Sequence, residues 1–125
     1  MTRESDSSTT NAREFEVRTE SVDGAVLVRV IGELDLSTHE QLRQPLMEAA
    51  GSGSTVVIDL AECEFIDSSG IRALLLGHEA LANDDGRKPL LIAAPQPQVM
   101  RVLEMTGVGE ALPVHESVDG ALAEA

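Results

Sequence analysis

Three short aliphatic runs constrain the fold of this chain more than any other feature of its sequence. They occupy residues 25–31, 55–60 and 90–93 and are rich in valine, isoleucine and leucine. Continuous runs of this length are typical of strands that are covered on both faces. Because segments with helical spacing of apolar residues follow the runs, the chain is predicted to form a mixed, mainly parallel α/β sheet with helical cover.

An antiparallel hairpin is expected to open this sheet. Residues 15–19 alternate Phe, Val and Thr with charged side chains, and Asp23-Gly24 supplies a turn into the run at 25–31. A short edge strand is expected near 111–114, because proline is tolerated in such strands. The sequence therefore predicts a sheet of four to five strands.

About four helices are predicted from apolar spacing and from capping residues. Their expected positions are from Asp35, Ser37 or Thr38 to Ala50, from about Ser69 to Ala82, from Pro97 to Met105 with Gly107 as terminator, and from Ser117 to Leu122. Pro45 lies inside the first helix, where it should remove one backbone hydrogen bond and introduce a kink.

Two further segments are predicted to lack regular structure. Residues 61–66 are expected to be a connector that turns Phe65 and Ile66 toward the core, and the polar residues 83–86 should end the second helix.

The length of 125 residues fits one domain and is too short for two. Residues 1–12 are polar or small and are predicted to be a disordered tail, so the domain is expected to span 13–125. No apolar stretch approaches the roughly 20 residues that span a bilayer, and no secretory signal is evident. The single cysteine, Cys63, forbids an internal disulfide and fits a reducing compartment. We therefore expect a cytoplasmic protein.

Charge narrows the classes of partner. The chain has 9 Lys and Arg against 22 Asp and Glu, a formal net charge of −13, and 2% of its residues are aromatic. Nucleic acids and anionic membranes attract basic surfaces, and single strands also need stacking aromatic side chains. We therefore expect neither nucleic acid nor membrane as a partner, and a basic protein surface fits better.

Two polar loops form the candidate site. They cover residues 32–38 and 66–70, and each leads into a predicted helix. Sites in open parallel sheets lie where strands end and helices begin. A serine at a helix start lies near unpaired backbone N–H groups, where a phosphate would be tolerated. From spacing alone, the simpler interpretation of Asp67, Ser68 and Ser69 is that they are cap and turn residues.

The wider context of this loop resembles a known family. The sequence FIDSSGI at 65–71 follows VIDL at 57–60, with GELD at 32–35 upstream and RVLEMTGV at 101–108 downstream. Together these motifs resemble the anti-sigma factor antagonists, which are single STAS domains of bacteria. The resemblance covers roughly residues 14–123.

The resemblance implies a partner switch. The unphosphorylated domain would bind an anti-sigma factor that is also a serine kinase, which frees a sigma factor, and phosphorylation would release the domain. A serine phosphatase would reset the cycle. By position Ser68 is the phosphoacceptor, with Ser69 as a minor alternative, and Asp35 and Asp67 lie beside it. Ser69 and Gly70 would shape the turn.

The resemblance also implies a partner surface and further properties of the chain. The expected partner-binding residues are Asp35, Ser37, Ser68, Ser69, Ile71, Arg72 and Leu75. We expect no catalytic residue, cofactor or metal, and a monomer or weak dimer. Relatives commonly have a second glycine where this chain has Arg72, which lies four residues after Ser68 and could reach back toward a phosphate. A solvated surface arginine is the simpler interpretation.

Three other functions stay open. A hydrolase could use His39, His78 or His115 as a base for Ser68, although the G-x-S-x-G motif is absent. A receiver-type domain could be phosphorylated on Asp59, with Asp35 and Asp67 holding magnesium, although the only lysine, Lys88, precedes a strand. A STAS module could also serve another kinase-controlled or ligand-sensing complex that does not act on a sigma factor.

Overall fold

Six strands, four α-helices and one 3-10 helix are formed by residues 14–82 and 90–125, which are the residues that this computed structural model describes. The strands are β1 (Glu16–Val22), β2 (Ala25–Leu34), β3 (Thr55–Asp59), β4 (Cys63–Ile66), β5 (Leu90–Ala93) and β6 (Val114–His115). The helices are α2 (His39–Ala50), α3 (Ser68–Ala82), α4 (Pro97–Thr106), η1 (Val108–Glu110) and α5 (Val118–Glu124). The predicted tail at 1–12, the domain start at 13 and the helix stop at 83–86 lie outside the described residues.

The sheet is mixed and mainly parallel, as predicted. Its strand order is β1-β2-β3-β5-β6, and β4 pairs with β2 outside this path. The β1–β2 hairpin is antiparallel, whereas all the other pairs are parallel. The prediction of four to five strands was one too low, because the predicted connector at 61–66 contains β4.

Strand β2 changes partner along its length. Its first half pairs with β3, from Ala25 opposite Thr55 onward, and its end pairs with β4. The change coincides with a register shift at Gly32, which has a φ of 101° and whose N–H donates to the carbonyl of Glu62 at 3.0 Å. A positive φ favours glycine, and an irregularity of this kind bends a strand. The bend brings the carboxyl end of β2 beside that of β4.

The placement of Phe65 differs from the prediction. Ile66 is buried, but Phe65 is 45% exposed rather than turned to the core. Successive side chains of a strand point to opposite faces, so the inward position of Ile66 directs its neighbour outward. Cys63, at the start of the same strand, is buried.

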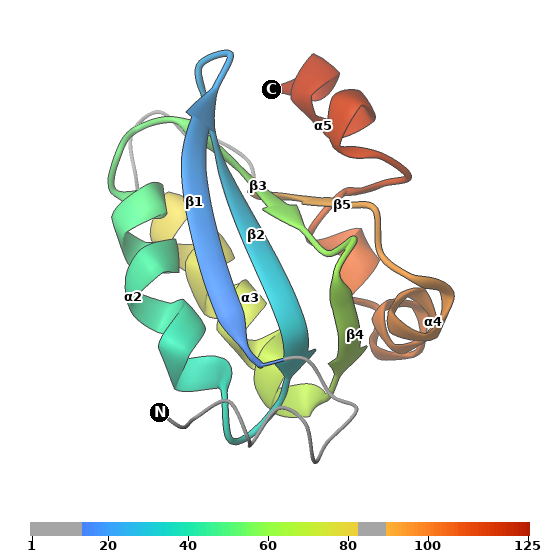
Figure 1. Cartoon of the computed structure of the whole chain (residues 1–125). Helices are drawn as coiled ribbons and strands as arrows, with labels where there is room; N and C mark the ends of the chain where they lie inside the picture. The colour runs from blue at the N-terminus through green and yellow to red at the C-terminus, as the bar shows by residue number, and fades with distance from the viewer. Residues whose placement is uncertain (1–13, 83–89) are drawn as a thin grey trace.

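Helices cover both faces of the sheet (Figure 1). The larger core lies between the sheet and α2, α3 and α4, and includes Val28, Leu42, Leu74 and Leu103. A smaller core on the other face packs Ala121 of α5 against strands β2, β3 and β5. Helices α2 and α3 approach closely at Gly77. A Cβ at this position would lie only 2.6 Å from a methyl group of Leu46, so the contact leaves no room for a side chain.

Several predicted local features are confirmed. Ser117 caps α5, because its hydroxyl accepts a hydrogen bond from the N–H of Gly120 at 2.9 Å. Gly107 ends α4 in the left-handed conformation, and α2 continues through Pro45 to Ala50.

In the part of the chain that the structure describes, no helix is long and apolar enough to cross a membrane.

Candidate functional site

Asp35 and Asp67 are brought side by side by the pairing of β2 with β4. Leu34 is opposite Ile66 in the parallel register, and each strand ends at that residue. The two aspartates are therefore the first residues beyond neighbouring strand ends. This is the edge of a parallel sheet at which functional loops gather.

Asp67 is the residue that connects the two loops. One carboxylate oxygen, Oδ1, accepts hydrogen bonds from the N–H groups of Ser69 at 2.8 Å and Gly70 at 3.2 Å. This is the bonding pattern of a helix N-cap, and it satisfies two donors that the first turn of α3 leaves open. The other oxygen, Oδ2, accepts from the N–H of Leu36 at 3.3 Å. The start of α3 is thereby tied to the loop that follows β2.

Asp35 organises a tight turn of its own. Its Oδ1 accepts hydrogen bonds from the hydroxyl of Ser37 at 2.8 Å and from the N–H of Ser37 at 3.0 Å. The hydrogen bond from the Ser37 hydroxyl is the main reason why the pKa of Asp35 lies below its ordinary value. The carboxylate is therefore held ionised and fixed in direction.

The expected capping of α2 by Asp35, Ser37 or Thr38 was wrong. Thr38 occupies the N-cap position, but its side chain makes no capping hydrogen bond. Its hydroxyl instead donates to the carbonyl of Glu33 at 2.7 Å and accepts from the N–H of Asp35 at 2.9 Å. The polar side chains of this loop thus stabilise the turn rather than the helix that follows.

Ser68 is the first residue of α3 and is exposed, one residue earlier than the predicted helix start. Its hydroxyl has no hydrogen-bond partner within residues 14–82 and 90–125. The neighbouring Ser69 is half-buried, and its N–H is held by Asp67. Of the two serines, Ser68 is therefore the one that presents its hydroxyl more freely to solvent.

Gly70 allows α3 to begin against the strand ends. A Cβ at this position would lie 2.7 Å from Cγ1 of Ile66 and 2.8 Å from both Cγ and the carbonyl oxygen of Leu34. Two of these neighbours are core side chains and one is backbone, so there is no room for any larger residue. The close contact fixes the position of Ser68 relative to β2 and β4.

Asp59 has a structural role that argues against a receiver-type site. It is 4% exposed, and its Oδ2 accepts a hydrogen bond from Nε of Arg29 at 3.1 Å. Its Oδ1 accepts from the N–H of Ala61 at 3.0 Å. Both oxygens are thus engaged, and Lys88 lies outside the described residues. Within the described ranges, no group of three or more His, Cys, Asp or Glu side chains could hold a metal ion.

Comparisons with known proteins agree with this geometry. The family model described as "STAS domain" matches residues 16–121. An anti-sigma F factor antagonist from Paenibacillus polymyxa is 31% identical over 112 residues, which are 88% of this chain and 94% of that protein. The chain belongs to the anti-sigma factor antagonists, a family of single STAS domains. These proteins are regulators rather than enzymes.

Solved structures of this family share the fold of this chain. One is an anti-sigma factor antagonist from Mycobacterium paratuberculosis, with 28% identity, a TM-score of 0.81, and coverage of 89% of this chain and 93% of that one. SpoIIAA in its unphosphorylated form has 27% identity and a TM-score of 0.68, with coverage of 87% and 95%. The resemblance to single STAS domains that the sequence motifs indicated is therefore confirmed.

The exposed face of α3 in this STAS domain differs from the predicted one. Ile71 is 6% exposed and belongs to the core, and Leu75 is half-buried, so Ile71 was wrongly placed on the partner surface. Arg72 is exposed, and Leu76 is 41% exposed. Sequence reasoning also missed Leu36, which is 73% exposed at the tip of the loop that Asp67 holds.

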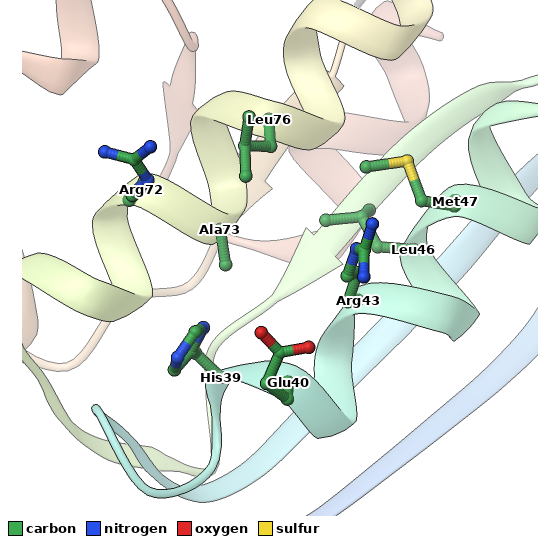
Figure 2. A pocket seen from close by; sticks show the side chains of 8 residues that line it. All are labelled: His39, Glu40, Arg43, Leu46, Met47, Arg72, Ala73 and Leu76. Atoms are coloured by element: carbon green, nitrogen blue, oxygen red, sulfur yellow. The ribbon is translucent and has the colours of Figure 1, made fainter.

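A groove lies between α2 and α3 of the STAS domain, next to the start of α3 (Figure 2). Its volume is about 210 Å³, and it is lined by His39, Glu40, Arg43, Leu46, Met47, Arg72, Ala73 and Leu76. Arg43 comes from α2 and Arg72 from α3, so each helix contributes one guanidinium. The groove is a feature that the sequence pattern did not indicate, because its residues come from two helices whose relative position is set by tertiary packing.

Proposed function

We propose that this STAS domain binds an anti-sigma factor serine kinase while Ser68 is unphosphorylated, and so frees a sigma factor. Phosphorylation of Ser68 by the bound kinase releases the domain, and a serine phosphatase restores it. Since sigma factors act on RNA polymerase, this cycle belongs in the bacterial cytoplasm. The observation that supports the proposal most is the exposed Ser68 hydroxyl at the capped start of α3, which has no hydrogen-bond partner among the residues that the structure describes.

Ser68 is well placed to accept a phosphoryl group. It precedes a helix of 15 residues, whose dipole favours negative charge at this end. Its side chain is exposed, so an added phosphate does not displace core atoms. Because Asp67 and Gly70 fix the backbone on either side, the kinase meets one defined conformation of the acceptor.

Release follows from charge and bulk without a change of fold. Phosphorylation adds about −1.5 to −2 charges at neutral pH. These charges arise at the strand ends that carry Asp35 and Asp67, on the same connected surface as the Ser37 turn. Asp67 directly precedes Ser68, and salt screens repulsion between such neighbouring charges only in part, because the Debye length is about 8 Å. A kinase surface that accommodates a neutral hydroxyl beside two carboxylates would no longer fit.

Relatives supply independent support. The curated relative from Paenibacillus polymyxa is named an anti-sigma F factor antagonist. SpoIIAA, which is 27% identical, has been solved in a form described as unphosphorylated. The sequence of the Ser68 loop and its position at the start of α3 fit the same type of control.

The test is to mix the purified chain with candidate anti-sigma kinases of the same genome and ATP. Phosphate is located by tandem mass spectrometry, and complex formation is followed by size-exclusion chromatography. We expect phosphate on Ser68 and loss of the complex. Ser68→Ala should keep the complex intact in ATP, whereas the matched variant Ser69→Ala should behave like the unmodified chain. Phosphate on Ser69, or a complex that survives full phosphorylation of Ser68, would refute the proposal.

A further inference from the structure

Arg72 lies one helical turn beyond Ser68 on the same helix. Residues four apart in an α-helix are neighbours on its surface, and helical side chains lean toward the N-terminus of the helix. Both Ser68 and Arg72 are exposed. The long side chain of Arg72 can therefore extend back to the space above the Ser68 hydroxyl.

The guanidinium of Arg72 has no ion-pair partner in the described part of the chain. Two other arginines differ in this respect, since Arg18 pairs with Glu16 at 2.6 Å and Arg29 pairs with Asp59 at 3.1 Å. Helix α3 contains no lysine and no second arginine. Arg72 is thus an uncommitted cation on the helix that begins with Ser68, in a chain whose formal net charge is −13.

The N–H groups of the three residues that follow Ser68 are already engaged. Asp67 accepts the N–H groups of Ser69 and Gly70 through Oδ1, and its carbonyl accepts the N–H of Ile71 at 3.0 Å. A phosphate on Ser68 would compete with the Asp67 carboxylate for these donors and would be repelled by it. A charged donor that reaches the phosphate from the next turn would satisfy it without disturbing the cap.

We propose that Arg72 is the counter-ion of phosphorylated Ser68. The inference rests on the proposed function only for the occurrence of that phosphate. In the unmodified domain Arg72 lines the groove between α2 and α3 with Arg43. In the phosphorylated domain its guanidinium turns to the phosphate, so the groove loses one of its two guanidinium groups. Phosphorylation of Ser68 thereby also changes the charge of the groove surface beside Leu76 and Met47.

The test uses full-length chain with phosphoserine placed at position 68 during synthesis, so that no kinase is needed. The second ionisation of the phosphate, which ordinarily has a pKa near 6, is followed by ³¹P NMR. A nearby cation favours the dianion, so we expect this pKa to be lower with Arg72 than in Arg72→Gln, by about 0.2 to 0.7. Arg72→Lys should retain part of the effect.

The matched control is Arg43→Gln. It removes the same charge from the opposite side of the groove but lies on α2 rather than on the helix of Ser68. This variant should leave the phosphate pKa close to that of the unchanged chain. The proposal would be overturned if the phosphate pKa were the same in the unchanged and Arg72→Gln chains. It would also be overturned if Arg43→Gln raised the phosphate pKa as much as Arg72→Gln does.

A second readout follows the groove itself. Methyl NMR signals of Met47 and Leu76 should shift between the chains with serine and with phosphoserine at position 68, and these shifts should disappear in Arg72→Gln. Shifts of equal size in the variant would overturn the link to the groove. A kinase that never modifies Ser68 would refute the proposed function and leave these measurements unaffected, so the two failures are distinguishable.

Discussion

Oδ2 of Asp67 accepts a hydrogen bond from the backbone N–H of Leu36 across 3.3 Å, between residues 31 positions apart in the chain. The same carboxylate caps α3 through its other oxygen. One side chain therefore holds together the turn after β2 and the start of the helix that carries Ser68. A partner that docks here meets both loops as one surface.

Loss of this carboxylate should weaken both loops together. We expect Asp67→Ala to lower the free energy of unfolding by about 0.5 to 2 kcal/mol, which is the usual cost of a lost N-cap. Urea denaturation measures this change, and amide hydrogen exchange should become faster at Leu36 as well as at Ser69. Glu79→Ala, an exposed acidic residue on the same helix, is the control and should change stability by less than about 0.5 kcal/mol. Unchanged exchange at Leu36 would argue against the bridge.

Gly70 should tolerate no side chain. Gly70→Ala places a methyl group within 2.8 Å of Leu34 and Ile66, so we expect a loss of about 1 to 3 kcal/mol in unfolding free energy from overpacking. Gly109→Ala is the matched control, because its nearest neighbour would be a methyl of Val114 at an ordinary 3.8 Å. Thermal or urea denaturation compares the two variants. Similar stabilities would show that the contact at Gly70 is relaxed in solution.

The depressed pKa of Asp35 should depend on Ser37. Ser37→Ala removes the hydroxyl hydrogen bond that is the main cause of the depression, so the pKa should rise toward its ordinary value of 3.8. An aspartate with a lowered folded-state pKa stabilises the fold above its unfolded pKa, and this contribution is lost as the pH falls through the folded value. Carboxyl ¹³C NMR between pH 2 and 6 follows Asp35 directly. Ser21→Ala, on the exposed edge strand β1, should leave the titration unchanged; a shift of similar size there would contradict the assignment.

Cys63 should be unreactive in the folded chain. The residue is buried, and burial raises the pKa of its thiol to about 11. Because the thiolate is the reactive form, modification by a soluble thiol reagent at pH 8 should be slow and should accelerate with urea through the unfolding transition. Rapid, complete labelling of the folded chain would mean that β4 opens readily.

Much of the fold could be predicted from local patterns. The Asp23-Gly24 turn, the aliphatic runs and the Ser117 cap are encoded by neighbouring residues, and the structure has each of them. Strand β4 could not be predicted in this way. It has four residues, and its pairing depends on a register shift at Gly32, about 30 positions earlier in the chain. The formation of β4 therefore depends on a contact between distant parts of the chain and not on a pattern of neighbouring residues.

The exposed face of α3 shows the same limit. Leu74, Leu75 and Leu76 are consecutive, so apolar spacing cannot decide which of the three faces solvent. The choice is fixed by the close contact of Gly77 with Leu46 on α2, which turns Leu76 outward and Leu74 into the core. The residues from Asp67 to Gly70 were singled out because their motif resembles a known family, whereas their spacing alone predicted only cap and turn residues.

Affinity for the anti-sigma kinase before and after phosphorylation tests the central claim most directly. Isothermal titration calorimetry would compare the unmodified chain with the chain that carries phosphoserine at position 68, using the kinase that forms the complex. We expect the unmodified chain to bind and the phosphorylated chain to bind at least about tenfold more weakly, a difference of about 1.4 kcal/mol or more. Equal affinity of the two forms would contradict the account.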